Sequence, residues 1–327
     1  MRIKKIVLCG ILAIAVALVG SPAWLGAQDT FPKGPITIIV PFPPGFVDMG
    51  ARTISESLSK ELGVPVIIEN KTGGGGLIGA TAFINSRPDG HTLLASTASA
   101  VISSVLLSKT PPFDPRKDLV PVAYLGDTPA VMAIGTKSLP QINTFDEFLK
   151  YAKANPGKLR GAVSGIGGEI HIMYETLVRD ASINSKFVPY PGIANLITGI
   201  LGGHLDWWCG TLPGVLQYQK SGDMKILLAT RKDSDLPNVP SGADVGLPRI
   251  SGNSWTSLFA HPKAPKEATD RLIAAVAKVI QTPEVAQKYA GTGFHPAYRP
   301  PAELAKLVSD SWDFYSQMIK EANIQIQ

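Results

Sequence analysis

The stretch Pro35-Ile-Thr-Ile-Ile-Val-Pro-Phe-Pro-Pro-Gly-Phe-Val-Asp48 decides the fold of this chain. Its apolar run from Ile36 to Val40 is typical of a short strand that is covered on both faces. Prolines cannot donate to a strand ladder, so the strand should end at Pro41, and Gly45 lets the backbone turn sharply. The pattern therefore predicts a buried strand that runs into a stiff loop.

A helix should follow this loop. Apolar residues recur on one helical face between Met49 and Leu62, and Asp48 is a candidate N-cap residue. Asp48 could instead order the loop, and both roles stay open. A stiff loop that leads into a helix N-terminus is a place where backbone N–H groups can hold an anion.

The same order of strand, glycine loop and helix occurs twice more. The second copy is a strand at 65–69, the loop Asn70-Lys-Thr-Gly-Gly-Gly-Gly76 and a helix at 77–86. The third copy is a strand at 160–163, the loop Ser164-Gly-Ile-Gly-Gly168 and a helix at 169–179. Strands that alternate with helices in this way favour parallel βαβ units and an α/β fold.

The N-terminal segment 1–27 has the pattern of a secretory signal peptide. Arg2, Lys4 and Lys5 precede an apolar core from Ile6 to Val19 that is too short to span a bilayer. Small residues before Gln28 predict cleavage after Ala27, which would place the mature protein in the periplasm. A retained membrane anchor is the alternative.

Composition limits the classes of partner. Removal of the leader removes three basic residues, so the formal net charge falls from +5 to +2, and no long basic run remains for nucleic acid. Cys209 would be the only cysteine of the mature chain, so no intrachain disulfide is expected. With 45% hydrophobic residues, the chain can build its own core.

Eight segments, taken together, resemble the solute-binding proteins of tripartite tricarboxylate transporters, the TctC-like or Bug family. They are Ile39-Val-Pro-Phe-Pro-Pro-Gly45, Asp48-Met-Gly-Ala-Arg52, Glu69-Asn-Lys-Thr-Gly-Gly-Gly-Gly76, Pro88-Asp-Gly-His-Thr-Leu-Leu94, Asn155-Pro-Gly-Lys158, Val188-Pro-Tyr190, Leu201-Gly-Gly-His-Leu-Asp206 and Leu236-Pro-Asn-Val-Pro240. The first loop has one glycine before Asp48 where the family usually has two, and Trp207-Trp208 replaces smaller residues. Both departures could reshape the pocket.

The resemblance implies a two-lobed clamp of the periplasmic-binding-protein type (type II-like), with a mixed sheet in each lobe and a cleft between the lobes. Lobe one would combine residues 28–126 with 231–327, and lobe two would be residues 127–230. The implied role is to capture a small organic carboxylate, either a di- or tricarboxylate or an aromatic acid. The receptor would deliver this ligand to the membrane subunits of a tripartite transporter. A carboxylate sensor or an interaction protein without transport is the alternative. We expect a monomer without cofactor or metal.

Glycine loops could bind a carboxylate without arginine, because each helix N-terminus carries roughly half a positive charge. The glycines could also serve only as tight βα turns. The residues expected at the ligand are Pro44, Gly45, Phe46, Asp48, Gly74, Gly75, Gly76, Ser96, Thr97, Ser164, Gly165, Gly167, Gly168, His171, Tyr190, Asp206 and Trp207.

Several of these residues have a purely structural alternative. Ser164 could be a helix cap, His171 a packed residue, Asp206 a cap, and Trp207 a core residue. Ser164, His171 and Asp206 are also the residue types of a hydrolase triad. The segment Gly161-Ala-Val-Ser-Gly165 misses the nucleophile-elbow pattern by one position, so we expect no enzyme.

Overall fold

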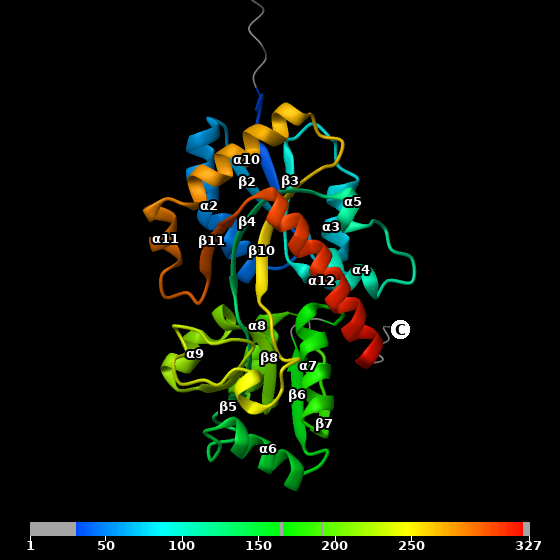
Figure 1. Ribbon diagram of the computed structural model, residues 1–327. Coiled ribbons are helices and arrows are strands. Elements are labelled where there is room, and N and C mark those ends of the chain that lie inside the picture. Colours follow the sequence, from blue (N-terminus) through cyan, green and yellow to red (C-terminus); the bar gives the residue numbers. More distant parts are fainter. Residues whose placement is uncertain (1–30, 164–165, 191, 323–327) are drawn as a thin grey trace, which may run out of the picture.

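The computed structural model describes residues 31–163, 166–190 and 192–322, and the predicted signal peptide lies outside this part. The chain forms two lobes, each built on a mixed β-sheet, as the sequence predicts (Figure 1). The first sheet has the order β11-β4-β10-β3-β1-β2 and the second the order β7-β6-β8-β5-β9.

The strands of the first sheet are β1 (Ile36–Val40), β2 (Val66–Asn70), β3 (Thr92–Ser96), β4 (Val120–Thr128), β10 (Ser254–Ala260) and β11 (His295–Arg299). Strand β1 is parallel to β2 and β3, whereas β10 is antiparallel to β3 and β4. The strands of the second sheet are β5 (Ala130–Gly135), β6 (Leu159–Val163), β7 (Ser185–Phe187), β8 (Trp207–Thr211) and β9 (Met224–Ala229). Strand β6 is parallel to β7 and β8, and β5 is antiparallel to β8 and β9.

Helices cover both faces of the first sheet. One face packs on α2 (Phe46–Leu62), α10 (Lys266–Ile280) and α11 (Pro283–Tyr289). The other face packs on α3 (Leu77–Ile84) and α12 (Pro301–Ala322), and on the π-turn Ser99–Ser103 that continues into α4 (Ser104–Leu106). Ile38 joins the first of these cores and Ile39 the second, so β1 is covered on both faces as predicted. The one-turn helix α5 (Pro115–Asp118) lies before β4.

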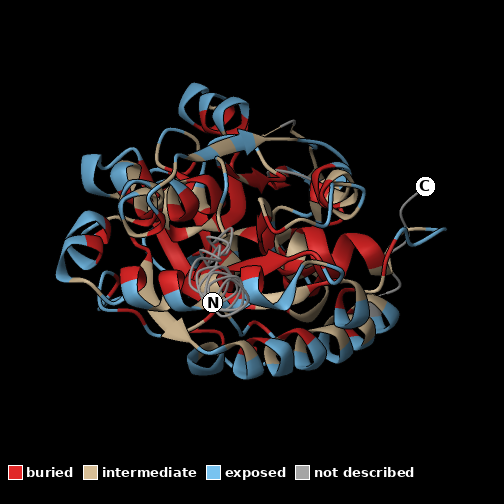
Figure 2. Ribbon diagram, turned by 90° about the horizontal axis from the view of Figure 1, so that it is seen from above, coloured by how far each residue is buried: buried red, intermediate tan, exposed pale blue. Residues whose placement is uncertain are grey.

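The second sheet is covered in the same way. Helices α6 (Phe145–Ala154) and α7 (Glu169–Asp180) pack on one face, and α8 (Ile193–Gly202) and α9 (Leu216–Ser221) pack on the other. The exposed residues lie mainly on the outer turns of the helices, and the strands between them are mostly buried (Figure 2). The predicted capping box of Thr144 and Glu147 at the start of α6 is present, and Gly203 ends α8 in the left-handed conformation.

The structure differs from the sequence prediction at the start of the first helix and in the C-terminal region. Helix α2 begins at Phe46 with Gly45 as its N-cap, so Asp48 lies in the first turn and is not the N-cap. Strand β11 and helix α11 have no counterpart in the sequence prediction. Strand β11 contains Pro296, which a strand tolerates because β11 lies at the edge of the sheet.

The chain crosses between the lobes twice. Only Pro129 separates β4 from β5, whereas the return from β9 to β10 takes residues 230–253. We expected residues 231–252 to belong to lobe one. The structure packs their apolar side chains on the second sheet, with Leu236 and Val239 on one face and Leu247 and Ile250 on the other.

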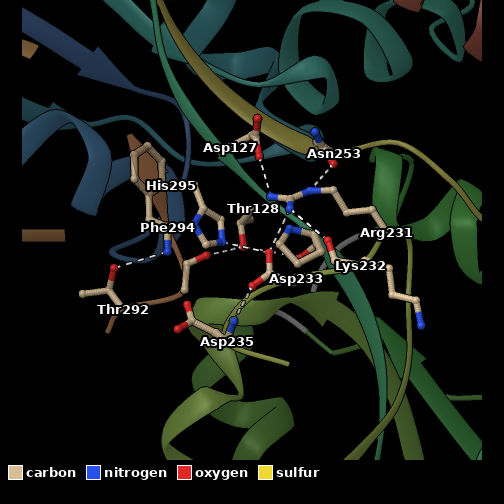
Figure 3. Close-up of polar contacts among 12 residues, drawn as sticks. Asp127, Thr128, Arg231, Lys232, Asp233, Asp235, Asn253, Thr292, Phe294 and His295 are labelled. Carbon is tan, nitrogen blue, oxygen red and sulfur yellow. Dashed lines mark hydrogen bonds and ion pairs between the residues drawn. The ribbon is translucent and has the colours of Figure 1, made fainter. Parts of the chain in front are cut away.

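Arg231 joins these two crossings electrostatically (Figure 3). Its Nη2 donates to Asp127 Oδ1 over 2.8 Å, and its Nε donates to Asn253 Oδ1 over 2.7 Å. Its Nη1 lies 2.9 Å from Asp233 Oδ2, which is also 2.8 Å from His295 Nε2 on strand β11. One guanidinium therefore connects the end of β4, the return crossing and the loop before β10.

Replacement of Arg231 should destabilise the protein strongly. The Asp233 side chain is fully buried, so Arg231→Ala leaves a buried carboxylate without its cation. We expect a loss of about 3 to 5 kcal/mol in the free energy of unfolding, measured by urea denaturation. The control is Arg87→Ala, because Arg87 is 89% exposed where it pairs with Asp89, and its loss should cost less than about 1 kcal/mol. Equal losses in the two variants would contradict this account of Arg231.

Candidate functional site

A cleft of about 830 Å³ lies where loops of the two lobes meet. The first lobe lines it with the loop after β1, the glycine loop after β2 and the turn after β3; these residues are Pro41, Phe42, Pro43, Pro44, Gly45, Phe46, Val47, Thr72, Gly73, Gly74, Gly75, Gly76, Thr97 and Ser99. The second lobe contributes Ile166, Gly168, Glu169, Ile170, Pro189, Tyr190, Gly192, Ile193 and Thr211. The volume is that of a site for a small molecule.

The loop after β1 is held in place by three polar side chains that lie behind it. Asn70 Nδ2 donates to the carbonyl oxygen of Phe42 and to Asp48 Oδ1, both over 2.9 Å. Arg52 Nε donates to the other oxygen of Asp48 over 2.8 Å. Asp48 is buried and does not line the cleft, so its contacts agree with the alternative that it orders the loop.

The glycine loop after β2 has a conformation that other residues rarely adopt. Gly73, Gly74, Gly75 and Gly76 have φ angles of 128°, 58°, 64° and 98°. The carbonyl oxygen of Gly75 accepts a hydrogen bond from Ser104 Oγ over 3.1 Å. The four glycines therefore form a fixed turn and not a flexible linker.

Four helices begin at a glycine that lines the cleft. The N-cap residues of α2, α3, α7 and α8 are Gly45, Gly76, Gly168 and Gly192, and none has a side-chain capping bond. Away from the cleft, Thr144 and Thr282 cap α6 and α11 with their hydroxyl groups. At α3 the backbone N–H groups of Leu77 and Ile78 already donate to the carbonyl oxygens of Gly74 and Gly73. The first-turn N–H groups of α2, α7 and α8 lack side-chain caps and can bind an anion from both lobes.

Among the described lining residues, Glu169 is the only one with a charged type of side chain. It is the first residue of α7 and is 7% exposed. Burial raises the pKa of its carboxyl to about 7, although the hydroxyls of Ser254 and Thr97 lower it in part. Glu169, Ser99 and Thr211 line the cleft but are not among the residues expected at the ligand from the sequence. The only local signal for Glu169 was its position directly after Gly167-Gly168.

The lobes approach each other closely at two glycines. A Cβ atom on Gly168 would lie 2.3 Å from Ser99 Oγ in the opposite lobe. A Cβ atom on Gly75 would lie 3.3 Å from the carbonyl oxygen of Ile166. Both glycines therefore allow a contact between the lobes, in addition to their roles in local turns.

The structure brings together nine of the predicted site residues as lining residues, namely Pro44, Gly45, Phe46, Gly74, Gly75, Gly76, Thr97, Gly168 and Tyr190. Six others do not line the cleft, namely Asp48, Ser96, Gly167, His171, Asp206 and Trp207. Ser164 and Gly165 lie outside the described residues.

Asp206 and Trp207 both have structural partners. Asp206 accepts two hydrogen bonds from the Arg160 guanidinium, over 2.7 and 3.0 Å, and a third from the backbone N–H of Arg160 over 2.7 Å. The Trp207 ring is fully buried and stacks on Tyr174 with 4.6 Å between ring centroids. Trp208 packs in the core on the opposite face of the sheet, so neither tryptophan reaches the cleft.

His171 also serves the local structure of α7. Its Nδ1 accepts a hydrogen bond from the backbone N–H of Gly167 over 3.2 Å, and its Nε2 lies 3.5 Å from Glu175. Since Asp206 pairs with Arg160, no hydrogen bond joins His171 to Asp206 in the described part of the chain. The described members of the hydrolase alternative are therefore not arranged as a base and its orienting acid.

One group of side chains has the spacing of a metal site. Ligand atoms of Asp233, Asp235 and His295 lie within 4.8 Å of one another. However, Arg231 Nη1 already pairs with Asp233 Oδ2, and a second cation would be repelled there. This group fits the ion-pair network of the crossings better than a metal centre.

No helix in the described part of the chain is long and apolar enough to cross a membrane. The family model described as the tripartite tricarboxylate transporter family receptor matches residues 50–324. The protein BugT of Bordetella pertussis is 30% identical over 329 residues, which is 98% of each chain.

Two solved structures have similar folds. MatC from Rhodopseudomonas palustris with bound malate has a TM-score of 0.80 and 28% identity, covering 88% of this chain and 100% of that one. An R. palustris protein with adipate has a TM-score of 0.84 and 26% identity, covering 90% of this chain and 99% of that one.

The contacts of Asp206 predict that its substitution lowers the stability of the protein without changing its affinity for a ligand. Asp206→Asn weakens the pair with Arg160, whose side chain is 38% exposed, so we expect unfolding to be easier by about 1 to 3 kcal/mol. Affinity for the cleft ligand should not change, because Asp206 does not line the cleft. Urea denaturation and calorimetric titration measure the two quantities. A loss of affinity without a loss of stability would contradict this placement.

Proposed function

Because the chain belongs to the family of tripartite tricarboxylate transporter receptors, we propose that it is an exported receptor for a small organic carboxylate. The ligand binds in the cleft and is delivered to the membrane subunits of a tripartite transporter. The leader pattern of residues 1–27, with cleavage after Ala27, supports export to the periplasm.

One observation carries the proposal. The cleft has uncapped helix N-termini on both lobes and, among its described residues, no basic side chain. An organic anion would be neutralised there by backbone N–H groups and helix dipoles. The helix dipoles favour an anion over a neutral ligand of the same shape.

The ligands of the structural neighbours support the same class. The two R. palustris proteins hold malate and adipate, which are both dicarboxylates. In this chain, one carboxylate would bind at the N-terminus of α2 and the loop 73–76, and the rest of the ligand would reach α7 and α8. A ligand that contacts both lobes favours the closed arrangement of the clamp by its differential contacts.

The aromatic side chains of the cleft are compatible with aromatic acids as well as with aliphatic acids. Phe42, Phe46 and Tyr190 line the cleft, and aromatic side chains can pack against an aromatic ligand. Trp207 does not contribute, because it is fully buried in the second lobe. The proposed ligand is therefore defined by its carboxylate, and the remainder of the ligand can be aliphatic or aromatic.

A thermal-shift screen of residues 28–327 tests the proposed function. The panel contains aliphatic di- and tricarboxylates, aromatic acids and amino acids, with the matching methyl esters as controls. A ligand at a hundred times its dissociation constant should add about 2.7 kcal/mol to the free energy of unfolding. We expect stabilisation by at least one acid and none by its full ester. Stabilisation by esters and acids alike, or by none of them, would refute the carboxylate role.

The contact between Gly168 and Ser99 predicts a selective effect on binding. Gly168 has φ −86° and ψ 174°, which any residue can adopt, but its new methyl group would meet Ser99 Oγ at 2.3 Å. We expect Gly168→Ala to keep the unfolding midpoint within a few degrees and to weaken ligand affinity about tenfold or more, because the lobes cannot approach as closely.

The matched control is the double variant Gly168→Ala with Ser99→Ala. Removal of the hydroxyl leaves Ser99 Cβ as the nearest atom of that side chain at 3.5 Å, which is ordinary contact. The double variant should recover most of the lost affinity in a calorimetric titration. Equal affinity of the two variants would show that lobe contact at this glycine does not control binding.

A further inference from the structure

Glu169 lies where the cleft meets the boundary between the lobes. It follows the N-cap Gly168 on α7 of the second lobe, and it lines the cleft. Its carboxyl is close enough to the hydroxyls of Thr97 and Ser254, which belong to the first sheet and its turn, for them to influence its pKa. Tyr315 of α12 lies beside it as well.

The carboxyl of Glu169 is incompletely satisfied. Its Oε2 is buried and has no hydrogen-bond partner among the described residues, and within that part of the chain it forms no ion pair. An ionised carboxylate without compensation is costly in such a place, and burial accordingly raises the pKa of Glu169 to about 7. The group can therefore hold or release its proton near neutral pH.

The other titratable groups around Glu169 are already paired or neutral. Tyr315 faces it from α12, and burial together with the nearby Glu169 raises the pKa of this tyrosine. Arg249 borders the same small cavity but pairs with Asp180 and Glu321. On α7 itself, His171 lies next to Glu175. No cation among these groups compensates Glu169.

We propose that Glu169 determines ligand selectivity by donating a hydrogen bond, in its neutral form, to a carboxylate oxygen of the ligand. The cleft then binds a dicarboxylate together with one proton. This inference rests on the proposed function. The proton comes from solvent whenever Glu169 is ionised in the free protein, and no covalent bond changes.

The chemistry of the site favours this role. A carboxylate that approaches the N-terminus of α7 comes next to Glu169, and two ionised carboxylates at such a distance repel each other. A proton shared between the two carboxyl groups removes this repulsion. A ligand ammonium group would instead select the ionised form of Glu169 and reverse the pH dependence.

A buried water is the other candidate partner for Oε2. Glu169 also borders a separate cavity of about 30 Å³, which is large enough for one water molecule. A water there would satisfy the carboxyl without any ligand. The affinity for ligands would then not follow the ionisation of Glu169, so the experiment below separates the two cases.

The expected pH dependence follows from the fraction of neutral Glu169. With a pKa of about 7, roughly nine-tenths of the molecules are neutral at pH 6 and roughly one-tenth at pH 8. The apparent affinity is the intrinsic affinity multiplied by this fraction. It should therefore fall about tenfold from pH 6 to pH 8.

Calorimetric titration of residues 28–327 with adipate and with malate, at pH 6 and pH 8, measures this fall. Titration in two buffers of different ionisation enthalpy should also show a larger uptake of protons per ligand at pH 8 than at pH 6. Monomethyl adipate replaces one carboxylate by an ester whose carbonyl oxygen accepts the same hydrogen bond without the negative charge, so it should show a smaller fall in affinity and a smaller proton uptake.

The variant Glu169→Gln is the matched control, because its amide donates a hydrogen bond and does not titrate. We expect it to bind the dicarboxylate equally at pH 6 and pH 8, with an affinity near that of the unchanged protein at pH 6. In the unchanged protein, an affinity that rises with pH or stays constant would overturn the proposal. A tenfold fall in the glutamine variant would overturn it as well.

The thermal-shift screen distinguishes failure of the proposed role of Glu169 from failure of the proposed receptor function. If a monocarboxylate stabilises the protein while neither adipate nor malate binds at either pH, the role of Glu169 is wrong and the receptor function stands. If no acid in the panel stabilises the protein, both ideas fail.

Discussion

Helix starts without side-chain caps are the constraint on which the cleft depends. A helix leaves its first N–H groups without partners, and a side-chain cap normally satisfies part of them. At the cleft these caps are replaced by glycines 45, 76, 168 and 192. The helix dipoles give the cleft a positive potential without a basic side chain among its described residues. This potential exists only because both sheets direct their loops to the same place.

The sheets position these groups through a small number of buried contacts. Asp48 and Asn70 fix the loop after β1, and Ser104 fixes the glycine loop through the carbonyl oxygen of Gly75. Arg231 fixes the two crossings relative to each other with its contacts to Asp127 and Asp233. The anion-binding groups of the site are thus backbone groups, and polar and charged side chains behind them fix the positions of the loops.

Much of the fold could be predicted from local signals. The apolar run of β1 and the capping box at Thr144 specify their elements within a few residues, and the structure confirms them. The mixed sheets and two lobes followed from the βαβ order and from the family resemblance. Strand β11 could not be predicted, because an edge strand that contains Pro296 has no alternating pattern.

The site was less accessible to sequence reasoning. The glycine loops were found, because glycine has a direct backbone meaning at such turns. Asp206 was selected because a polar residue after a glycine turn could face a ligand, yet its partner Arg160 lies 46 residues away and local sequence does not show it. Glu169 was missed for the same reason, since its burial depends on a strand and a helix from the other lobe.

A cleft walled by backbone has an evolutionary consequence. Substitutions at most positions do not alter an N–H group, so the capacity to hold an acid is insensitive to sequence drift as long as the glycines persist. Side chains that line the same space, such as Phe46, Glu169 and Tyr190, can change without removing these N–H groups. On the proposed function, a few point mutations of these side chains would therefore exchange one acidic ligand for another without rebuilding the receptor.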